Sequence, residues 1–199
     1  MPVRRQEERL NLTYLESISD NALMEKVKSG NLDQLGLLFE RYKKILFGFF
    51  YNLNHDAPLS EDLVQNTFMR ILKYREGFKG EGEFKVWMFH IARNISHDHF
   101  RKNKIKDTDD IASWSDRLGD SSGNRDDVFV QNEEMLMLKM AMNKLDLEKR
   151  EILTMSKLDG MKYKQIGEVL SCSEGAVKVK VFRALQSLKE AYRHIQSQV

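Results

Sequence analysis

Aromatic rings and cations alternate along residues 84–104, which read FKVWMFHIARNISHDHFRKNK. Proteins that hold single-stranded nucleic acid combine rings that stack on exposed bases with cations that follow the phosphates. Helical spacing turns Trp87 and Ile91 towards a core. Five polar side chains form the outer set, which suits single-stranded DNA and a solvated surface equally well. They are Lys85, Asn94, His97, Arg101 and Lys102.

Three histidines, His90, His97 and His99, lie in the same segment beside Asp98. Their spacings do not gather a ligand set on one face of a helix, and no cysteine accompanies them, so we expect no metal site. The chain also lacks a phosphate-binding P-loop, a dinucleotide-binding glycine motif and a nucleophile beside a base. We therefore expect a protein that is not an enzyme and that uses no cofactor.

A second segment with a chemical pattern is residues 163–182, YKQIGEVLSCSEGAVKVKVF. Ile166 and Val169 form the inner face of a short helix, and Gly167 leaves room for a second helix to approach closely. A tight turn follows, in which Ser171 stands where glycine is common. This arrangement predicts a helical hairpin.

The second helix of that hairpin is expected to begin at Ser173 as its N-cap, with Glu174 at its positive end. Lys178, Lys180 and Arg183 lie on its outer face. A helix that presents cations in this way can enter the major groove of DNA. The alternative is an ordinary helical hairpin whose basic face is solvated.

A third segment, residues 60–72, predicts a helix capped by Ser60. Its buried stripe is expected to contain Leu63, Val64, Phe68, Ile71 and Leu72. The opposite side carries Glu61, Asp62, Gln65, Asn66 and Met69. Amides and a thioether beside acids suit a protein partner surface better than a simply solvated face.

The elements that position these segments are helices, because apolar residues recur at three- and four-residue spacing along most of the chain. A helix capped by Asp20 is expected to open the first unit, and Gly77, Gly80 and Gly82 form a loop in it. In the second unit, one helical stripe is expected to contain Met135, Leu138, Met142 and Leu145.

The predicted fold class is all-α. It comprises two small helical domains, an N-terminal helical bundle and a C-terminal helix-turn-helix domain, joined by an acidic flexible linker. The expected boundaries are a tail at 1–14, a first domain at 15–105, the linker at 106–130 and a second domain at 131–199.

The charge pattern supports this division. The 199 residues carry a net charge of only +2, yet nine acids and two bases lie between 107 and 134. Residues 85–106 contain six bases and one acid, and residues 157–199 contain eight bases and four acids. Two basic segments separated by an acidic one indicate two surfaces that face polyanions.

Composition also sets expectations for location. Cys172 is the only cysteine, so an intrachain disulfide is excluded and a reducing compartment is favoured. The N-terminus has no apolar core of signal-peptide length, and the longest apolar run, residues 45–53, is too short to span a membrane. We expect a cytoplasmic protein without direct membrane insertion.

Taken together, these segments resemble the extracytoplasmic-function (ECF) sigma factors, the small two-domain branch of the main bacterial sigma family. Residues 60–68, SEDLVQNTF, are similar to the family's polymerase-binding motif, and residues 84–94 to its promoter-melting helix. Lys149-Arg-Glu151, Asp159-Gly160 and the hairpin are similar to its C-terminal domain. A stand-alone helix-turn-helix regulator with an N-terminal sensing or dimerisation domain is the alternative.

The resemblance implies an alternative sigma factor that binds RNA polymerase core and directs promoter-specific initiation. The clamp helices of the largest polymerase subunit would contact Glu61, Asp62, Gln65, Asn66 and Met69. The −10 element would be read and melted by Lys79, Phe84, Lys85, Asn94, His97, Arg101 and Lys102. The −35 element would be read as duplex by Ser173, Glu174, Lys178, Lys180 and Arg183.

The resemblance also implies partners and a role for the glycine-containing loop. The linker would run along the polymerase interior, and an anti-sigma factor would hold the protein inactive. The loop at 78–84 would hold an unpaired −10 base, on which Phe84 would stack; a plain connecting loop is the alternative. Ala176, Val179 and Lys180 differ from the residues common in the family's recognition helix, which leaves the promoter sequence open.

Overall fold

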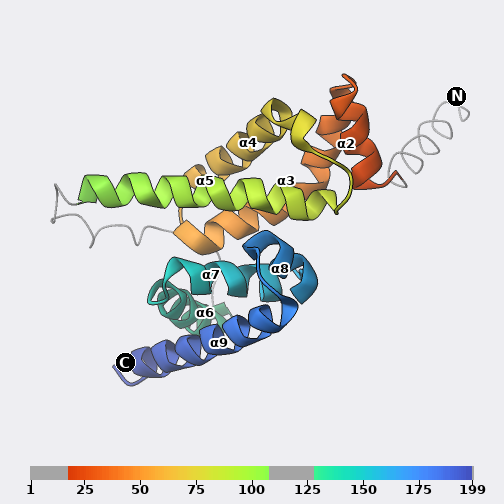
Figure 1. Ribbon diagram of the computed structural model, residues 1–199. Coiled ribbons are helices and arrows are strands. Elements are labelled where there is room, and N and C mark those ends of the chain that lie inside the picture. Colours follow the sequence, from red (N-terminus) through yellow and green to blue (C-terminus); the bar gives the residue numbers. More distant parts are fainter. Residues whose placement is uncertain (1–17, 108–127, 199) are drawn as a thin grey trace, which may run out of the picture.

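The computed structural model describes residues 18–107 and 128–198, with side chains described for 18–102 and 133–198 (Figure 1). Every regular element in these ranges is helical, which confirms the all-α prediction for this part of the chain. The predicted tail at 1–14 and most of the predicted linker at 106–130 lie outside the described residues.

The N-terminal unit packs four α-helices around one aromatic core. Helix α3 contacts α2 and α4, and α5 closes the unit against α4 and α2. The rings of Phe49, Phe50 and Phe89 are fully buried and meet edge to face. The elements of this unit are α2 (Asp20–Lys28), α3 (Asp33–Asn54), α4 (Ala57–Lys73), a 3₁₀ turn (Arg75–Gly77) and α5 (Phe84–Asp107).

Two helices of this unit begin at other residues than the sequence predicted. The N-cap of α2 is Ser19, whose hydroxyl accepts the Ala22 amide at 3.3 Å, whereas Asp20 is turned towards α3. The N-cap of α4 is Asp56, and Ser60 is buried inside the helix, where its hydroxyl donates to the Asp56 carbonyl at 2.6 Å. The caps predicted at Asp20 and Ser60 are therefore wrong.

The C-terminal unit places its longest helix, α9, across three shorter segments, α6, α7 and α8. A π-turn directly follows α7. The elements are α6 (Val128–Asn143), α7 (Leu147–Leu153), the π-turn (Thr154–Leu158), α8 (Tyr163–Leu170) and α9 (Glu174–Gln196).

The predicted stripe of α6 is only partly correct. Met142 and Leu145 are buried, but Met135 and Leu138 are 53% and 39% exposed, and Leu145 follows the end of the helix. Leu185 of α9 is likewise 39% exposed. Both helices thus present apolar side chains to solvent.

The two units are in direct contact, which the sequence did not indicate. Helix α8 packs against α5, and α7 with the following π-turn packs against α3 (Figure 1). Arg150 of α7 donates through Nη1 to the Leu53 carbonyl of α3 at 2.7 Å. The apolar residues of both units form a single buried cluster.

Candidate nucleic-acid and partner interfaces

Helix α4 presents one polar face to solvent. Leu63, Val64, Phe68 and Ile71 are buried as predicted, and Leu72 is partly exposed. All members of the opposite set are exposed, with Met69 at 66%. This set, the α4 face, contains Glu61, Asp62, Gln65, Asn66 and Met69. An exposed thioether among acids and amides fits a partner surface with an apolar centre.

A hollow of about 200 Å³ lies between the loop at 77–83 and the first turns of α5. Gly80 adopts a φ of +73°, a left-handed conformation that glycine reaches at little cost. Trp87, which we expected to be core, is only partly buried and lines the hollow, with its ring 5.3 Å from that of Phe78. The exposed Lys79 contributes a cation.

Phe84 does not line this hollow. Its side chain is 1% exposed, and its ring lies 5.6 Å from Tyr42 and 6.2 Å from Phe78. The expectation that Phe84 stacks on a base is therefore corrected, because the ring is part of the core. Phe78 and Trp87 both line the hollow, but Phe78 is 2% exposed, so Trp87 is the ring of this pair that can offer its surface to a base.

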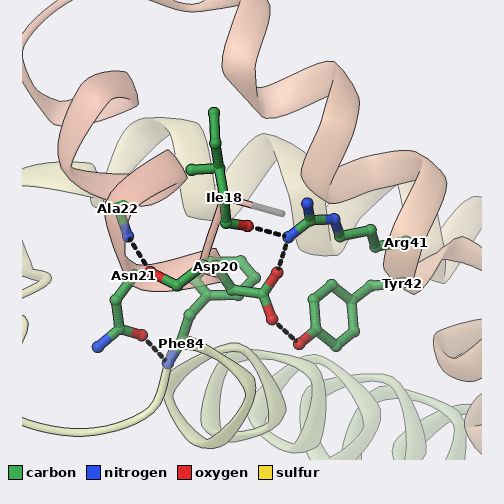
Figure 2. A network of polar contacts seen from close by, with 8 residues as sticks. Ile18, Asp20, Asn21, Ala22, Arg41, Tyr42 and Phe84 are labelled. Carbon is green, nitrogen blue, oxygen red and sulfur yellow. Dashed lines mark hydrogen bonds and ion pairs between the residues drawn. The ribbon is translucent and has the colours of Figure 1, made fainter. Parts of the chain in front are cut away.

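Hydrogen bonds from α3 hold the first turn of α2 in place beside Phe84. Arg41 donates through Nη1 to Asp20 Oδ1 at 2.6 Å and to the Ile18 carbonyl at 2.8 Å (Figure 2). The Tyr42 hydroxyl donates to the other oxygen of Asp20. Burial, together with this hydrogen bond, raises the pKa of Tyr42 above its usual value, so the hydroxyl remains a donor.

The polar residues predicted on α5 divide into two groups. Asn94, Arg101 and Lys102 are exposed, and Arg101 pairs with Asp98 at 3.1 Å. Lys85 and His97 instead face the C-terminal unit. Lys85 Nζ donates to the Asp159 carbonyl at 3.2 Å, and His97 Nε2 lies 2.7 Å from Glu151 Oε1.

Glu151 is the central charged residue of this seam between the units. It is 0% exposed, and Arg93 Nε donates to its Oε2 at 3.0 Å. Burial raises the pKa of the Glu151 carboxyl, while the nearby His97 and Arg93 act in the opposite direction. Because a buried carboxylate is costly without partners, this contact depends on both units.

Asp159 lies at the same seam, and its Oδ2 is buried without a hydrogen-bond partner among the described residues. Burial raises the pKa of this carboxyl to about 7, although Lys85 lowers it. As the pH rises from about 4 to about 7, the unfolded chain releases a proton that the folded chain retains. Folding stability therefore falls across this window.

We expect Asp159→Asn to remove that penalty, since the amide has the same shape and no charge. The melting temperature of the variant should exceed that of the wild type by roughly 2–6 °C above pH 7, and by less at pH 5. Thermal unfolding followed by circular dichroism at several pH values measures this, with Glu190→Gln on α9 as the control. Equal pH slopes for wild type and Asp159→Asn would contradict the assignment.

The hairpin of α8 and α9 has the predicted turn. A Cβ at Gly167 would lie 2.6 Å from the Cys172 carbonyl oxygen, which explains the small residue. Ser171 adopts a φ of +53°, the conformation for which glycine is favoured. Ser173 Oγ accepts the Ala176 amide at 3.2 Å, so the predicted cap is confirmed.

The outer face of α9 carries the predicted cations. Lys178 pairs with Glu174 at 3.0 Å, Lys180 pairs with Glu148 of α7, and Arg183 is exposed. The sequence did not indicate that two apolar side chains of the same helix, Val179 and Phe182, are 49% and 61% exposed. Apolar side chains beside cations can contact thymine methyl groups in a major groove.

Within residues 18–107 and 128–198 no group of three or more histidine, cysteine or acidic side chains is arranged to hold a metal ion. None of the helices in the same ranges is long and apolar enough to cross a membrane.

Two family models match the chain, in the order of its two units. The model for sigma-70 region 2 matches residues 38–105, and the model for sigma-70 region 4 matches residues 135–188. They cover the α4 face, the loop, α5 and the hairpin.

Curated relatives match over most of their length. The chain is 27% identical to the ECF RNA polymerase sigma-E factor of Haemophilus influenzae over 183 residues, covering 87% of this chain and 95% of the relative. It is 25% identical to the RNA polymerase sigma-H factor of Pseudomonas aeruginosa, covering 86% and 93% of the two chains.

Two solved structures share the fold. CnrH in complex with the cytosolic domain of CnrY aligns with a TM-score of 0.65 and 23% identity, covering 86% of this chain and 95% of the other. The sigma factor RpoE in complex with the anti-sigma factor NepR from Bartonella quintana aligns with a TM-score of 0.62 and 23% identity, covering 78% and 96%.

Proposed function

The chain belongs to the extracytoplasmic-function sigma factors and directs RNA polymerase to promoters, and from this premise we propose how its two units divide that task. It is a non-enzymatic factor with sigma-70 regions 2 and 4. The domain at 15–105 binds core polymerase and opens the −10 element, and the domain at 131–199 binds the −35 element as duplex. The linker at 106–130 runs between them along the polymerase.

The observation that carries the first assignment is the exposure of the α4 face on the side of the helix opposite the buried Leu63, Val64, Phe68 and Ile71. Five exposed positions on one side of the helix offer carboxylates, amides and a thioether in a segment that region 2 covers. The clamp helices of the largest polymerase subunit are the proposed partner. This assignment places Glu61, Asp62, Gln65, Asn66 and Met69 in the polymerase interface.

For the −10 element we propose a division between the loop and α5. Lys79 and Trp87, at the hollow of about 200 Å³, hold an unpaired base. Asn94, Arg101 and Lys102 follow the separated strand along the exposed side of α5. Phe84 supports the loop from the core rather than touching DNA.

Lys85 and His97 complete the proposed melting surface only when the two units separate. In the described arrangement they contact Asp159 and Glu151 of the C-terminal unit. We therefore propose that the free protein binds DNA weakly and that assembly with polymerase exposes the remaining part of α5.

For the −35 element, α9 is the proposed recognition helix. Ser173 and Glu174 lie at its start, and Lys178, Lys180 and Arg183 supply donors to bases and phosphates. Phe182 adds an apolar contact beside them.

An anti-sigma factor is the proposed negative regulator, and the cytoplasm is the proposed location. The support for the regulator is the shared fold with RpoE, whose structure contains the anti-sigma factor NepR. The exposed apolar residues of α6 and α9 offer such a partner hydrophobic surface.

The division between loop and helix is tested on promoters whose −10 region is already unpaired. We expect Arg101→Ala and Lys102→Ala to reduce transcription from duplex promoters by several-fold, because melting loses phosphate contacts. Pre-melted templates should restore their activity, but should not restore that of Lys79→Ala, which reads a base. Equal rescue of all three variants would remove the proposed reading role of the loop.

A further inference from the structure

We infer that Asn21 is a positioning residue for the −10 base, because it holds both the loop that forms the hollow and the first residue of α5. This inference rests on the proposed reading function of the loop at 78–84. The sequence gives no signal for it, since the loop residues that Asn21 contacts are about sixty positions away in the chain.

The side-chain amide of Asn21 makes three hydrogen bonds, one as an acceptor and two as a donor. Its Oδ1 accepts the backbone amide of Phe84 at 2.8 Å, as Figure 2 shows, and its Nδ2 donates to the Gly82 carbonyl at 2.8 Å and to the Gly80 carbonyl at 3.5 Å. The first bond satisfies an amide at the start of α5 that has no partner within the helix. The second fixes the direction of a carbonyl in the loop.

Asn21 is one of three polar side chains that follow the loop along a single face of α2. Lys28 Nζ donates to the Phe78 carbonyl at 2.9 Å, at the beginning of the loop. Glu25 lies between, and a Cβ added at Gly80 would be 3.0 Å from its Oε1. Positions 21, 25 and 28 have the spacing of one helical face.

Helix α2 is itself fixed, so it can act as a rigid support. Its opposite face is fully buried through Leu23, Met24 and Val27. Asp20, the residue before Asn21, is held by Arg41 and Tyr42 of α3. The side chain of Asn21 therefore fixes the loop backbone relative to α3. Without it, the glycines of the loop would leave this backbone free to change conformation.

The backbone around the hollow is therefore fixed by Asn21 of α2, and α2 is fixed by its contacts with α3. The loop carbonyls and amides around it can distinguish bases only if their directions are constant. Asn21 sets both ends of the short segment between Gly82 and Phe84, and Trp87 follows one helical turn later. Loss of the Asn21 side chain should therefore reduce the preference among the four bases more than it lowers total transcription.

The experiment compares two substitutions on pre-melted templates. Asn21→Ala removes all three hydrogen bonds of the side chain. Asn21→Asp keeps an acceptor for the Phe84 amide but places an oxygen against the Gly82 carbonyl. Each −10 position is varied through all four bases, and open-complex formation by the holoenzyme is measured. Lys26→Ala, on an exposed position of α2, is the control, and Lys79→Ala reports on the loop itself.

We expect the wild type and Lys26→Ala to prefer the same base at the position where Lys79→Ala loses preference. Both Asn21 variants should reduce that preference about tenfold and keep polymerase affinity within about twofold. Hydrogen exchange of the Phe84 amide should be accelerated in Asn21→Ala and remain slow in Asn21→Asp. Such a pattern separates positioning of the loop from general stability.

Three other outcomes would overturn the inference, and they differ in what else they remove. If Lys79→Ala loses base preference while both Asn21 variants keep it, the loop reads the base without help from Asn21. If none of these variants changes the preference, the proposed reading function of the loop fails as well. If the Asn21 variants lose open-complex formation equally with all four bases, Asn21 has a merely structural role.

Discussion

Replacing Asp62 and Gln65 together with alanine is expected to abolish transcription by weakening the binding of core polymerase. Both residues are exposed on the α4 face, near Met69, which is 66% exposed. Polar residues that surround an apolar anchor can act as interface hot spots, so the loss should be about 2–4 kcal/mol. A titration of each protein with purified core polymerase, monitored by fluorescence anisotropy, measures the change in affinity.

Folding should survive this double substitution, since neither side chain contributes to the buried stripe of α4. The melting temperature and the DNA affinity of the chain provide that check. A matched control replaces Glu40 and Asn31, an exposed acid and an exposed amide outside α4. Wild-type affinity of a correctly folded Asp62→Ala, Gln65→Ala variant for core polymerase would contradict the assignment of the α4 face.

Replacing Lys178, Lys180 and Arg183 with alanine is expected to reduce transcription from promoters that need the −35 element by at least about a hundredfold. A side chain that reads a base contributes about 1–3 kcal/mol, and a phosphate contact adds further affinity. The ion pairs of Lys178 and Lys180 within the free protein lower the net gain from each contact. Run-off transcription by the holoenzyme measures the effect.

Single variants distinguish the two kinds of contact. A residue that reads a base should lose discrimination at one −35 position, whereas a phosphate contact should weaken all sequences alike. Lys189→Ala, on an exposed position further along α9, is the control for loss of charge. Normal transcription by the triple variant from promoters that depend on the −35 element would mean that another face of α9 meets DNA.

Local patterns in the sequence were sufficient to predict the helices and two of the surfaces, the α4 face and the α8–α9 hairpin. The stripe of α4 and its exposed opposite face follow from helical periodicity, and the α8–α9 turn follows from Gly167 and the Ser173 cap. The error at Ser60 has a local cause as well. Asp56 and Ser60 are both good N-caps, and Pro58 in the first turn favours the earlier start that the structure has.

The parts that sequence reasoning missed depend on contacts between distant segments. Glu151 is a charged residue in a short amphipathic helix, and nothing near it in the chain indicates that Arg93 lies 3.0 Å away. Phe84 begins an aromatic and basic helix, so its burial against Tyr42 of α3 was not visible from spacing. Periodicity finds which residues are inward, but it does not identify their partners.

Transcription from a defined pool of genomic promoter fragments shows whether this chain directs core polymerase to promoters through the α4 face and α9. Purified chain and core polymerase are mixed, and the transcripts are sequenced. We expect the full chain to select a small promoter class with common −10 and −35 elements. We expect the Asp62→Ala, Gln65→Ala variant to yield none of these transcripts. A wild-type chain that neither binds core polymerase nor changes its choice of promoters would mean that the α4 face and α9 do not have these roles.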